Sequence, residues 1–339
     1  MSITMLPEWH PQDAIQLSWP HANSDWQPWL ADIEALFVQL CRQISQYQGV
    51  VVAVDPSIAL SDVERNLKLA GAKLANIKLY SVPTNDTWAR DHGPISVLRD
   101  GQLALMNFTF NAWGGKFSAN LDNEINQTLA NQNAYKVPLI ANQQELEGGG
   151  IETDGLGTLL CTSYWRDQRF KNTEQAEAFF SQALGMRRFL WLTSKNLAGD
   201  DTDAHIDTLA RFVNESTIAY VHCHNPDDPH YAMLSNMAEQ LTRFKTPTGE
   251  PYQLVPLPMP EVIVSDEGDP LPATYANFLI TNEEIIVPLY GDPNDDTALA
   301  SLAAVAGHRR VTGINCRTAI EQYGSLHCLT MQLTKGACL

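Results

Sequence analysis

The stretch Trp29–Val54, WLADIEALFVQLCRQISQYQGVVVAV, contains the pattern that decides the fold. Its first part places apolar residues along one face of a helix, at Leu30, Ile33, Leu36, Phe37, Leu40 and Ile44. Its last part, Val50–Val54, is an uninterrupted apolar run and is typical of a buried strand. The stretch therefore predicts a helix over residues 29–47 that leads directly into a strand.

The same helix-then-strand pattern recurs along the chain. The clear copies are Thr173–Leu184 before Phe189–Leu192, Pro229–Phe244 before Tyr252–Leu257, and Asp295–Ala306 before Arg310–Ile314, and a weaker copy is Leu121–Asn133 before Lys136–Ile140. Between them lie predicted hairpins, Ile95–Leu98 with Leu103–Phe110 and Phe278–Ile280 with Ile285–Leu289. About five copies without a low-complexity linker predict a repeat architecture in one domain, residues 1–339. An ordinary doubly wound sheet would give the same alternation.

Composition narrows the classes of partner. The formal net charge of -17 argues against nucleic acid and anionic membranes, and it suits a small cationic molecule. No apolar run reaches the roughly 18 residues of a membrane span, and the start, MSITMLPEWHPQD, lacks the pattern of a signal peptide. The six widely spaced cysteines fit reduced thiols. We therefore expect a folded cytoplasmic protein.

Four polar segments are candidates for a site. The first, NDTWARDHGP at Asn85–Pro94, precedes a predicted strand, and a plain turn would explain it equally well. The second, Glu145–Gly150, places three glycines after Glu147, where the backbone can approach another segment closely. In the third, Gly199–Phe212, an extended chain would put His205 and Asp207 on one face. A metal site or a simple His–Asp pair would both fit this face.

The fourth segment, YGSLHCLTM at Tyr323–Met331, predicts a short strand with a thiol near its start. In a strand His327 would point away from Cys328 and would be a poor general base for it. Taken alone, Cys328 reads more readily as a buried structural thiol. A further cluster, His222–His230, has enough ligands for zinc, but a strand end, a loop and a helix start explain it better.

Taken together and in order, these segments resemble the agmatine deiminase family, which includes the bacterial type of peptidylarginine deiminase. The matching pieces are NDTWARDHGP, FNAWGGK, LEGGGIETDG, GDDTDAHIDTLARF, ANFLITNEEIIVPLYGDP and LHCLT, and they extend from Asn85 to Thr330. The resemblance implies an α/β fold of the pentein type, a five-bladed propeller of pseudo-repeated units around a central site. It also implies that the protein uses no metal and no organic cofactor, and it leaves room for a homo-oligomer.

The resemblance assigns roles to five residues. It implies that Cys328 is the nucleophile, that His205 is the acid and base with Glu147 as its supporting carboxylate, and that Asp91 and Asp207 bind the guanidinium. Two carboxylates suit that ligand because a guanidinium is a planar fork of N–H donors. Trp88 and Trp113 either line the pocket or pack in the core. The sequence departs from the family at Ala204, where Gly is common, and at Gly324–Leu326.

The implied reaction is hydrolysis of agmatine to N-carbamoylputrescine and ammonia, in putrescine biosynthesis. Peptidylarginine or free arginine is the alternative substrate, and it would call for a cationic or amide group to receive its carboxylate. Two hypotheses come from other classes. One is a metallohydrolase that uses the Asp201–Asp207 face or the His222–His230 cluster, and the other is a non-enzymatic propeller that binds a partner.

Overall fold

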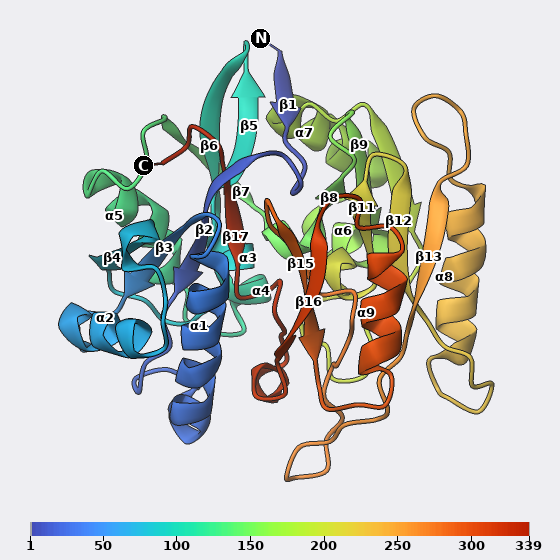
Figure 1. Cartoon of the computed structure of the whole chain (residues 1–339). Helices are drawn as coiled ribbons and strands as arrows, with labels where there is room; N and C mark the ends of the chain where they lie inside the picture. Colours follow the sequence, from blue (N-terminus) through green and yellow to red (C-terminus); the bar gives the residue numbers. More distant parts are fainter. Residues whose placement is uncertain (1, 339) are drawn as a thin grey trace. The chain divides into compact units, whose positions relative to one another are not determined.

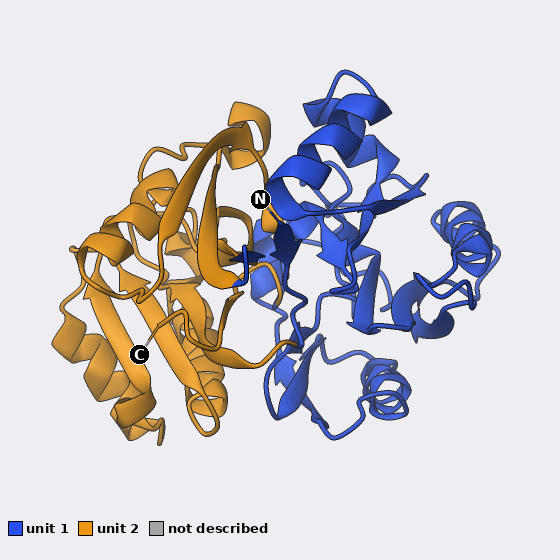
Figure 2. Ribbon diagram, turned by 90° about the horizontal axis from the view of Figure 1, so that it is seen from above, with its two compact units in different colours: residues 1–9, 98–101, 149–326 blue, residues 10–97, 102–148, 327–339 orange. Residues whose placement is uncertain are grey.

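The computed structural model describes residues 2–338 and has an α/β fold (Figure 1). The chain divides into two compact units, each made of segments far apart in sequence (Figure 2). Unit 1 comprises Met1–Trp9, Leu98–Gly101 and Gly149–Leu326, and unit 2 comprises His10–Val97, Gln102–Gly148 and His327–Leu339. The single domain over residues 1–339 stays a prediction. Within residues 2–338, no helix is both long and apolar enough to cross a membrane.

Unit 2 contains two copies of one motif, in which two antiparallel strands are followed by a helix and by a third strand parallel to the second. In the first copy the elements are β17 (Met331–Thr334), β2 (Gln12–Ser18), α1 (Leu30–Ile44) and β3 (Gly49–Val54). Its sheet continues through α2 (Leu60–Leu69) into β4 (Ile77–Ser81). In the second copy they are β5 (Ile95–Arg99), β6 (Gln102–Thr109), α5 (Ile125–Asn131) and β7 (Leu139–Glu145).

Unit 1 contains three more copies of the motif. The first is β8 (Glu152–Thr153), β9 (Thr158–Thr162), α6 (Ser163–Arg169), α7 (Thr173–Leu184) and β10 (Arg188–Leu192). The second is β11 (Ala210–Asn214), β12 (Thr217–His222), α8 (Tyr231–Arg243) and β13 (Gln253–Pro258). The third is β14 (Leu279–Ile280), β15 (Glu284–Leu289), α9 (Asp295–Ala303) and β16 (Arg310–Asn315).

The predicted repeats are therefore confirmed as five β-β-α-β motifs within residues 2–338. The strands belong to five small sheets rather than to one large sheet, so the doubly wound alternative is wrong. The stretch quoted first folds as expected, since α1 buries Ile33, Phe37 and Ile44 on one face and every residue of β3 is buried. Each such side chain contributes about 1.5–3 kcal/mol when it is fully removed from water.

Local chemistry explains the best-predicted boundaries. Helix α7 begins after Asn172, whose side chain accepts the Gln175 N–H, and it ends at Gly185, which adopts a left-handed conformation. The hairpin of β5 and β6 turns through Asp100 and Gly101, with φ of 49° and 78°, as a tight two-residue turn requires.

Two of the predicted conformations are wrong. Strand β17 begins only at Met331, and Cys328 lies in the turn before it, closed by the Thr330 N–H donating to the His327 carbonyl oxygen. Strand alternation therefore cannot set the direction of His327. The extended chain expected through His205 and Asp207 is also wrong, because residues Ile206–Thr208 form a short 3-10 helix. The weaker repeat is shifted as well, since its strand β7 starts at Leu139 rather than near Lys136.

Candidate active site

Three of the predicted site residues, Asp91, Glu147 and Cys328, belong to unit 2, and the main chain of Arg90 connects their segments. The Arg90 N–H donates to the Cys328 carbonyl oxygen at 3.1 Å. A Cβ added at Gly148 would lie 2.3 Å from the Arg90 carbonyl oxygen, so this position must stay glycine. Cys328 takes part in the first contact, Asp91 follows Arg90 and Glu147 precedes Gly148 in sequence, and all three site residues are buried. Unit 2 thus brings two carboxylates and a thiol into one region.

The Arg90 side chain fixes the turn that carries Cys328. Its guanidinium donates to Gln332 Oε1 at 2.7 Å and contacts the sulfur of Met331. Both residues lie in β17, directly after the turn. Because Arg90 is buried and engaged with its own unit, it acts as a structural residue of the thiol segment rather than as an anion receptor.

Asp91 is bonded to one ring of a small aromatic cluster that contains Trp88, Trp113 and Phe117. The carboxylate accepts the Trp113 indole N–H at 3.0 Å, and Trp88 is the residue before the short helix α3 (Ala89–His92) that carries Asp91. The rings of Trp88 and Trp113 lie edge to face at 6.4 Å, and Phe117 packs on the outer side of Trp113. Trp88 is buried and Trp113 is partly exposed. Trp113 thus orients the Asp91 carboxylate, while Trp88 is a buried ring packed against Trp113.

Two further carboxyl groups in unit 2, Asp86 and Asp122, support the Asp91 segment. Asp122 Oδ1 accepts the N–H groups of Asn85 and Asp86, and Asp86 Oδ1 accepts the Trp26 indole N–H at 2.9 Å. Burial raises the pKa of Asp122 to about 7, and the neighbouring Asp86 adds to that rise. Burial also raises the pKa of Asp86 to about 6. Asp86 therefore belongs to the support of the segment that carries Asp91.

The other two predicted residues, His205 and Asp207, belong to unit 1 and are fully buried. His205 caps the 3-10 helix Ile206–Thr208, and its carbonyl oxygen accepts the Thr208 hydroxyl at 2.8 Å. The Asn277 side-chain amide donates to the Asp207 carbonyl oxygen at 3.3 Å. The turn thus carries an imidazole and a carboxylate two positions apart, on a backbone held by hydrogen bonds from Thr208 and Asn277.

The sequence interpretation missed two buried polar residues of this region. Asn277 lies in an apolar run, where an amide has to be bonded, and that burial pattern is the signal that pointed to it. Asp200 precedes the turn, and its carboxylate accepts the backbone and hydroxyl groups of Thr202 at 2.9 and 2.6 Å. Burial raises the pKa of Asp200, and the negative charge of Asp207 acts in the same direction. Asp200 is therefore close enough to the pair to act on it electrostatically.

A buried ion-pair network lies next to the His205 turn in the fold. Arg211 in β11 binds Glu152 Oε1 at 2.6 Å and Glu8 Oε2 at 2.5 Å, and it also donates to the Phe278 carbonyl oxygen. Although burial opposes its charge, the two glutamates raise the pKa of Arg211, and Asp207 adds to the effect. The network therefore keeps the Arg211 cation buried on β11, the strand that follows the His205 turn.

The two segments that the sequence offered as alternative metal sites do not form a metal-binding group. Within residues 2–338, neither the Asp201–Asp207 face nor the His222–His230 segment belongs to a group of three side chains that could hold a metal ion. The rings of His222 and His224 lie 4.2 Å apart, whereas His230 bonds to Asp228. The predicted strand end and following helix are confirmed there, with α8 beginning at Tyr231.

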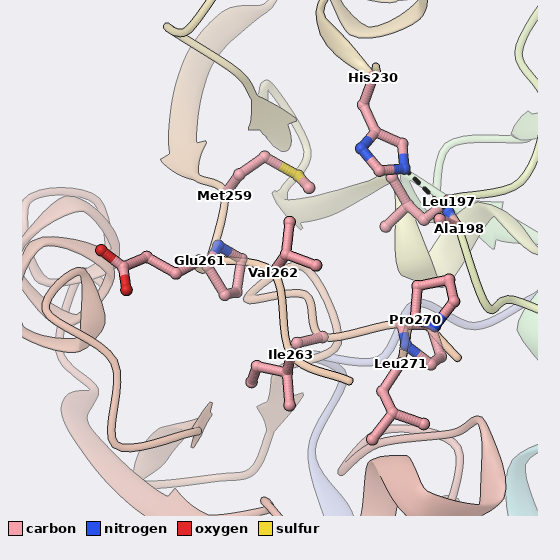
Figure 3. A pocket seen from close by; sticks show the side chains of 12 residues that line it. Leu197, Ala198, His230, Met259, Glu261, Val262, Ile263, Pro270 and Leu271 are labelled. Carbon is pink, nitrogen blue, oxygen red and sulfur yellow. Dashed lines mark hydrogen bonds between the residues drawn. The ribbon is translucent and has the colours of Figure 1, made fainter. Parts of the chain in front are cut away.

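A small pocket of unit 1 lies beside the segment that leads to His205 (Figure 3). Its volume is about 40 Å³, and prolines and aliphatic side chains between Met259 and Ala273 line most of it. His230 Nε2 accepts the Ala198 N–H at 2.9 Å at its edge. The pocket is too small for an agmatine-sized ligand.

Three of the other cysteines are weak acids because they are buried. Burial raises the pKa of Cys41 and of Cys338 to about 12, and it raises the pKa of Cys316 as well. All six cysteines are free thiols, in agreement with the reduced state expected from their spacing. A thiol with a raised pKa is a poor nucleophile at neutral pH.

Comparison with protein families places the chain among known enzymes. The model of the Porphyromonas-type peptidyl-arginine deiminase family matches residues 4–333. An agmatine deiminase of Pseudomonas syringae pv. tomato is 30% identical over an alignment 356 positions long, gaps included. The alignment covers 97% of this chain and 94% of that protein.

Solved structures give the same result. A C. jejuni agmatine deiminase, a Cys-to-Ser variant with substrate bound, is 36% identical with a TM-score of 0.90, covering 98% of this chain and 97% of the other. An amidinotransferase of Microseira wollei shares only the fold, at 11% identity and a TM-score of 0.54 over 99% of this chain and 98% of its own.

Proposed function

This chain belongs to the Porphyromonas-type peptidyl-arginine deiminase family, and we infer that it is an agmatine deiminase, a hydrolase that converts agmatine to N-carbamoylputrescine and ammonia. The observation that carries the inference is the match to agmatine deiminases over nearly the whole length of both chains. The substrate-bound C. jejuni relative supports the same substrate. The guanidino C–N bond is therefore the bond that this enzyme cleaves.

We propose that Asp91 and Asp207 bind the guanidinium through its N–H donors, since a planar cation with several donors pairs best with carboxylates. The Trp113 indole N–H holds the Asp91 carboxylate in one orientation. Asp200 lies within electrostatic reach of Asp207, so a cationic substrate bound there would favour the ionised form of both carboxyl groups. Glu147, buried in unit 2, is assigned as the carboxylate that supports His205.

In the proposed reaction the Cys328 thiolate forms a bond to the central guanidinium carbon and gives a tetrahedral adduct. His205 delivers a proton to one terminal nitrogen, and the C–N bond breaks to release ammonia. Water then adds to the amidino-thioether carbon while His205 takes its proton. Cleavage of the C–S bond releases the ureido product and returns the thiolate.

The charged groups favour agmatine over arginine, because an arginine substrate needs a receptor for its carboxylate. Three arginines that could serve as that receptor are all engaged elsewhere. Arg90 binds Gln332, Arg166 pairs with Asp167 and lies over the Trp191 ring, and Arg169 lies over the Trp165 ring. Agmatine lacks the carboxylate and needs no such receptor. The proposed substrate is therefore a small molecule with two cationic ends.

We also propose that the five β-β-α-β motifs form the five-bladed propeller of the pentein fold. The number of motifs and the shared fold of an amidinotransferase support this arrangement. We expect the protein to act in the cytoplasm on a free small molecule in putrescine biosynthesis.

The purified full-length protein tests the function directly. Agmatine, arginine and a peptide ending in arginine are supplied separately, and ammonia and the ureido product are measured. Ammonia from agmatine at a rate well above that from the other two is expected. Release from the arginine substrates alone would replace agmatine with the alternative, and no ammonia from any of them would overturn the deiminase assignment.

A Cys328→Ser variant tests the nucleophile, and Cys223→Ser is its matched control. Cys223 is also a buried free thiol, and a serine hydroxyl can keep its contact with the Asn225 carbonyl oxygen. We expect the first variant to lose at least about a thousandfold in kcat, as for other covalent nucleophiles, and the second to keep full activity. Mass spectrometry of the wild type during turnover should find the amidino adduct on Cys328. Full activity of Cys328→Ser would disprove the mechanism.

A further inference from the structure

Two consecutive non-glycine residues with left-handed backbone directly precede His205. Asp203 and Ala204 have φ of 64° and 62°. This region is disfavoured for residues with a Cβ, and Ala has no polar side chain that could bond locally to offset the cost. Such a conformation persists only where surrounding structure enforces it. The cause must therefore lie in the contacts of these two residues.

Helix α6 supplies contacts to both of them. Thr162, the residue that caps its start, donates its hydroxyl to the Ala204 carbonyl oxygen at 2.8 Å and accepts the Trp165 N–H at 3.2 Å. Arg169, the last residue of α6, pairs with Asp203 Oδ2 at 3.4 Å. One end of the helix thus holds the backbone of Ala204, and the other end holds the side chain of Asp203.

Arg169 is itself held firmly. Its guanidinium lies 4.6 Å over the Trp165 ring and donates to the Trp165 carbonyl oxygen at 3.4 Å. Only 6% of its side chain is exposed, so water screens its pairing with Asp203 little. Trp165 is in turn packed against Gly150, where an added Cβ would lie 2.5 Å from the ring. The cation therefore occupies one place and determines where Asp203 sits.

The opposite side of His205 is bonded as well. Its N–H donates to the Thr202 hydroxyl at 3.3 Å, and that hydroxyl donates to Asp200 at 2.6 Å. The peptide before the imidazole is therefore fixed by Thr202 on one side and by α6 on the other. We propose that Arg169 and Thr162 are positioning residues for His205, because they hold Asp203 and Ala204 in the left-handed conformation that presents the imidazole.

This inference rests on the proposed function, in which His205 is the acid and base. If Arg169 is lost, Asp203 loses the contact that holds it, and the adjoining Ala204 can then leave the left-handed region together with it. The imidazole of His205 would then leave its working orientation for most of the time. We expect Arg169→Met to lower kcat for agmatine about tenfold, which corresponds to about 1.4 kcal/mol, with KM changed less than twofold. Met keeps apolar contact with Trp165 but cannot pair with Asp203.

Rescue by glycine separates positioning from general structural support. Glycine populates the left-handed region without penalty, so Ala204→Gly should make the Arg169 contact dispensable. We expect the double variant Arg169→Met/Ala204→Gly to recover to within about threefold of the wild-type kcat. Arg166→Met is the matched control, because Arg166 lies in the same helix but contacts Asp167 and Trp191 instead, and it should leave kcat unchanged. Unchanged kcat in Arg169→Met, or a loss that glycine does not rescue, would overturn the proposal.

A second pair of variants covers the case in which Arg169→Met does not fold. Thr162→Ser keeps the hydroxyl and should retain activity, whereas Thr162→Val removes the bond to Ala204 and should lower kcat by a similar factor. Equal activity of these two variants would contradict the role of Thr162.

Hydrogen exchange of residues 198–206 tests whether Arg169 holds the backbone before His205, without reference to catalysis. Exchange should be faster in Arg169→Met than in Arg166→Met. Equal exchange in both would contradict this role of Arg169 even if agmatine is not the substrate. Conversely, no ammonia from the wild type, or full activity of His205→Asn, would refute the proposed function and leave the exchange result standing.

Discussion

The two groups of candidate site residues are held in place by different means. In unit 2, Cys328 and Glu147 are fixed mainly through the main chain of Arg90, by a backbone hydrogen bond on one side and a glycine packed on a carbonyl oxygen on the other, and the Arg90 guanidinium adds a bond to the strand after the Cys328 turn. In unit 1, His205 and Asp207 are fixed through side chains: Thr162, Arg169, Thr202 and Asn277. A main-chain arrangement tolerates most side-chain changes but no added atom at the contact. A side-chain arrangement can be loosened one residue at a time.

The largest effect is expected from Arg211→Met in unit 1. The substitution leaves Glu8 and Glu152 buried without their cation, and such a loss costs about 3–5 kcal/mol of unfolding free energy. Thermal or urea unfolding measures it. Arg243→Met, which removes the exposed pair with Glu239, is the control and should change little. A stability equal to that of the wild type would show that the buried network does not support the side-chain arrangement.

The next effect comes from unit 2, where Gly148→Ala forces a Cβ against the Arg90 carbonyl oxygen. Overpacking of this kind costs about 1–3 kcal/mol, and the shift should displace Glu147 and lower kcat at least tenfold. Gly71→Ala, at a turn with open space around it, should affect only stability. If Gly148→Ala kept the wild-type kcat, the contact between Gly148 and the Arg90 carbonyl oxygen would not be what positions Glu147.

A smaller effect is expected from Trp113→Phe, which removes the indole N–H that binds Asp91. Phe keeps the ring contacts with Trp88 and Phe110, so the loss is that of one hydrogen bond to a carboxylate. We expect kcat/KM for agmatine to fall about tenfold, or about 1.4 kcal/mol. Trp191→Phe loses a similar bond to Glu177 outside the site and should leave kcat/KM unchanged.

The smallest effect is a pH dependence of stability in unit 2. Folding raises the pKa of Asp122 from 3.8 to about 7, so the folded state binds the proton more tightly than the unfolded state does. Its contribution is fully present below pH 4 and is lost as pH rises through about 7. Asp122→Asn keeps the acceptor oxygen but cannot ionise, so it should stabilise the protein at pH 8 by on the order of 1 kcal/mol.

Denaturant unfolding at pH 5 and pH 8 measures this difference. The gain of Asp122→Asn should be clearly smaller at pH 5 than at pH 8, because only part of the contribution is lost between pH 4 and pH 5. Asp62→Asn on the exposed face of α2 should show no such change. A gain of the same size at both pH values would mean that ionisation of Asp122 is not its cause.

The sequence predicted most of the fold because its signals were local. Periodic apolar residues identified α1, and Asn172 and Gly185 define the ends of α7 through contacts within a few residues. The turn that carries Cys328 was mistaken for a strand because its conformation depends on Arg90, more than two hundred residues earlier in the chain. A local apolar pattern contains no record of such a contact.

The sequence could predict only those residues of the candidate site whose side chains themselves have a chemical role in the implied reaction. The resemblance pointed to Asp91, Glu147, His205, Asp207 and Cys328, and the structure buries all five. It could not point to Thr162 or Arg169, whose importance comes from a strained backbone at Ala204 that no sequence pattern records. Asp200 and Asn277 were missed for a similar reason, since each acts through burial beside Asp207.

Strand β17 completes the first repeat by pairing with β2, although more than 300 residues separate the two strands in sequence. A chain that folds while it is being synthesised can therefore finish four repeats before the first one closes. The thiol turn directly before β17 takes its place only with this long-range pairing. A chain in which β17 has not yet joined β2 thus holds an unassembled nucleophile, and catalytic competence should arise only when the first repeat closes.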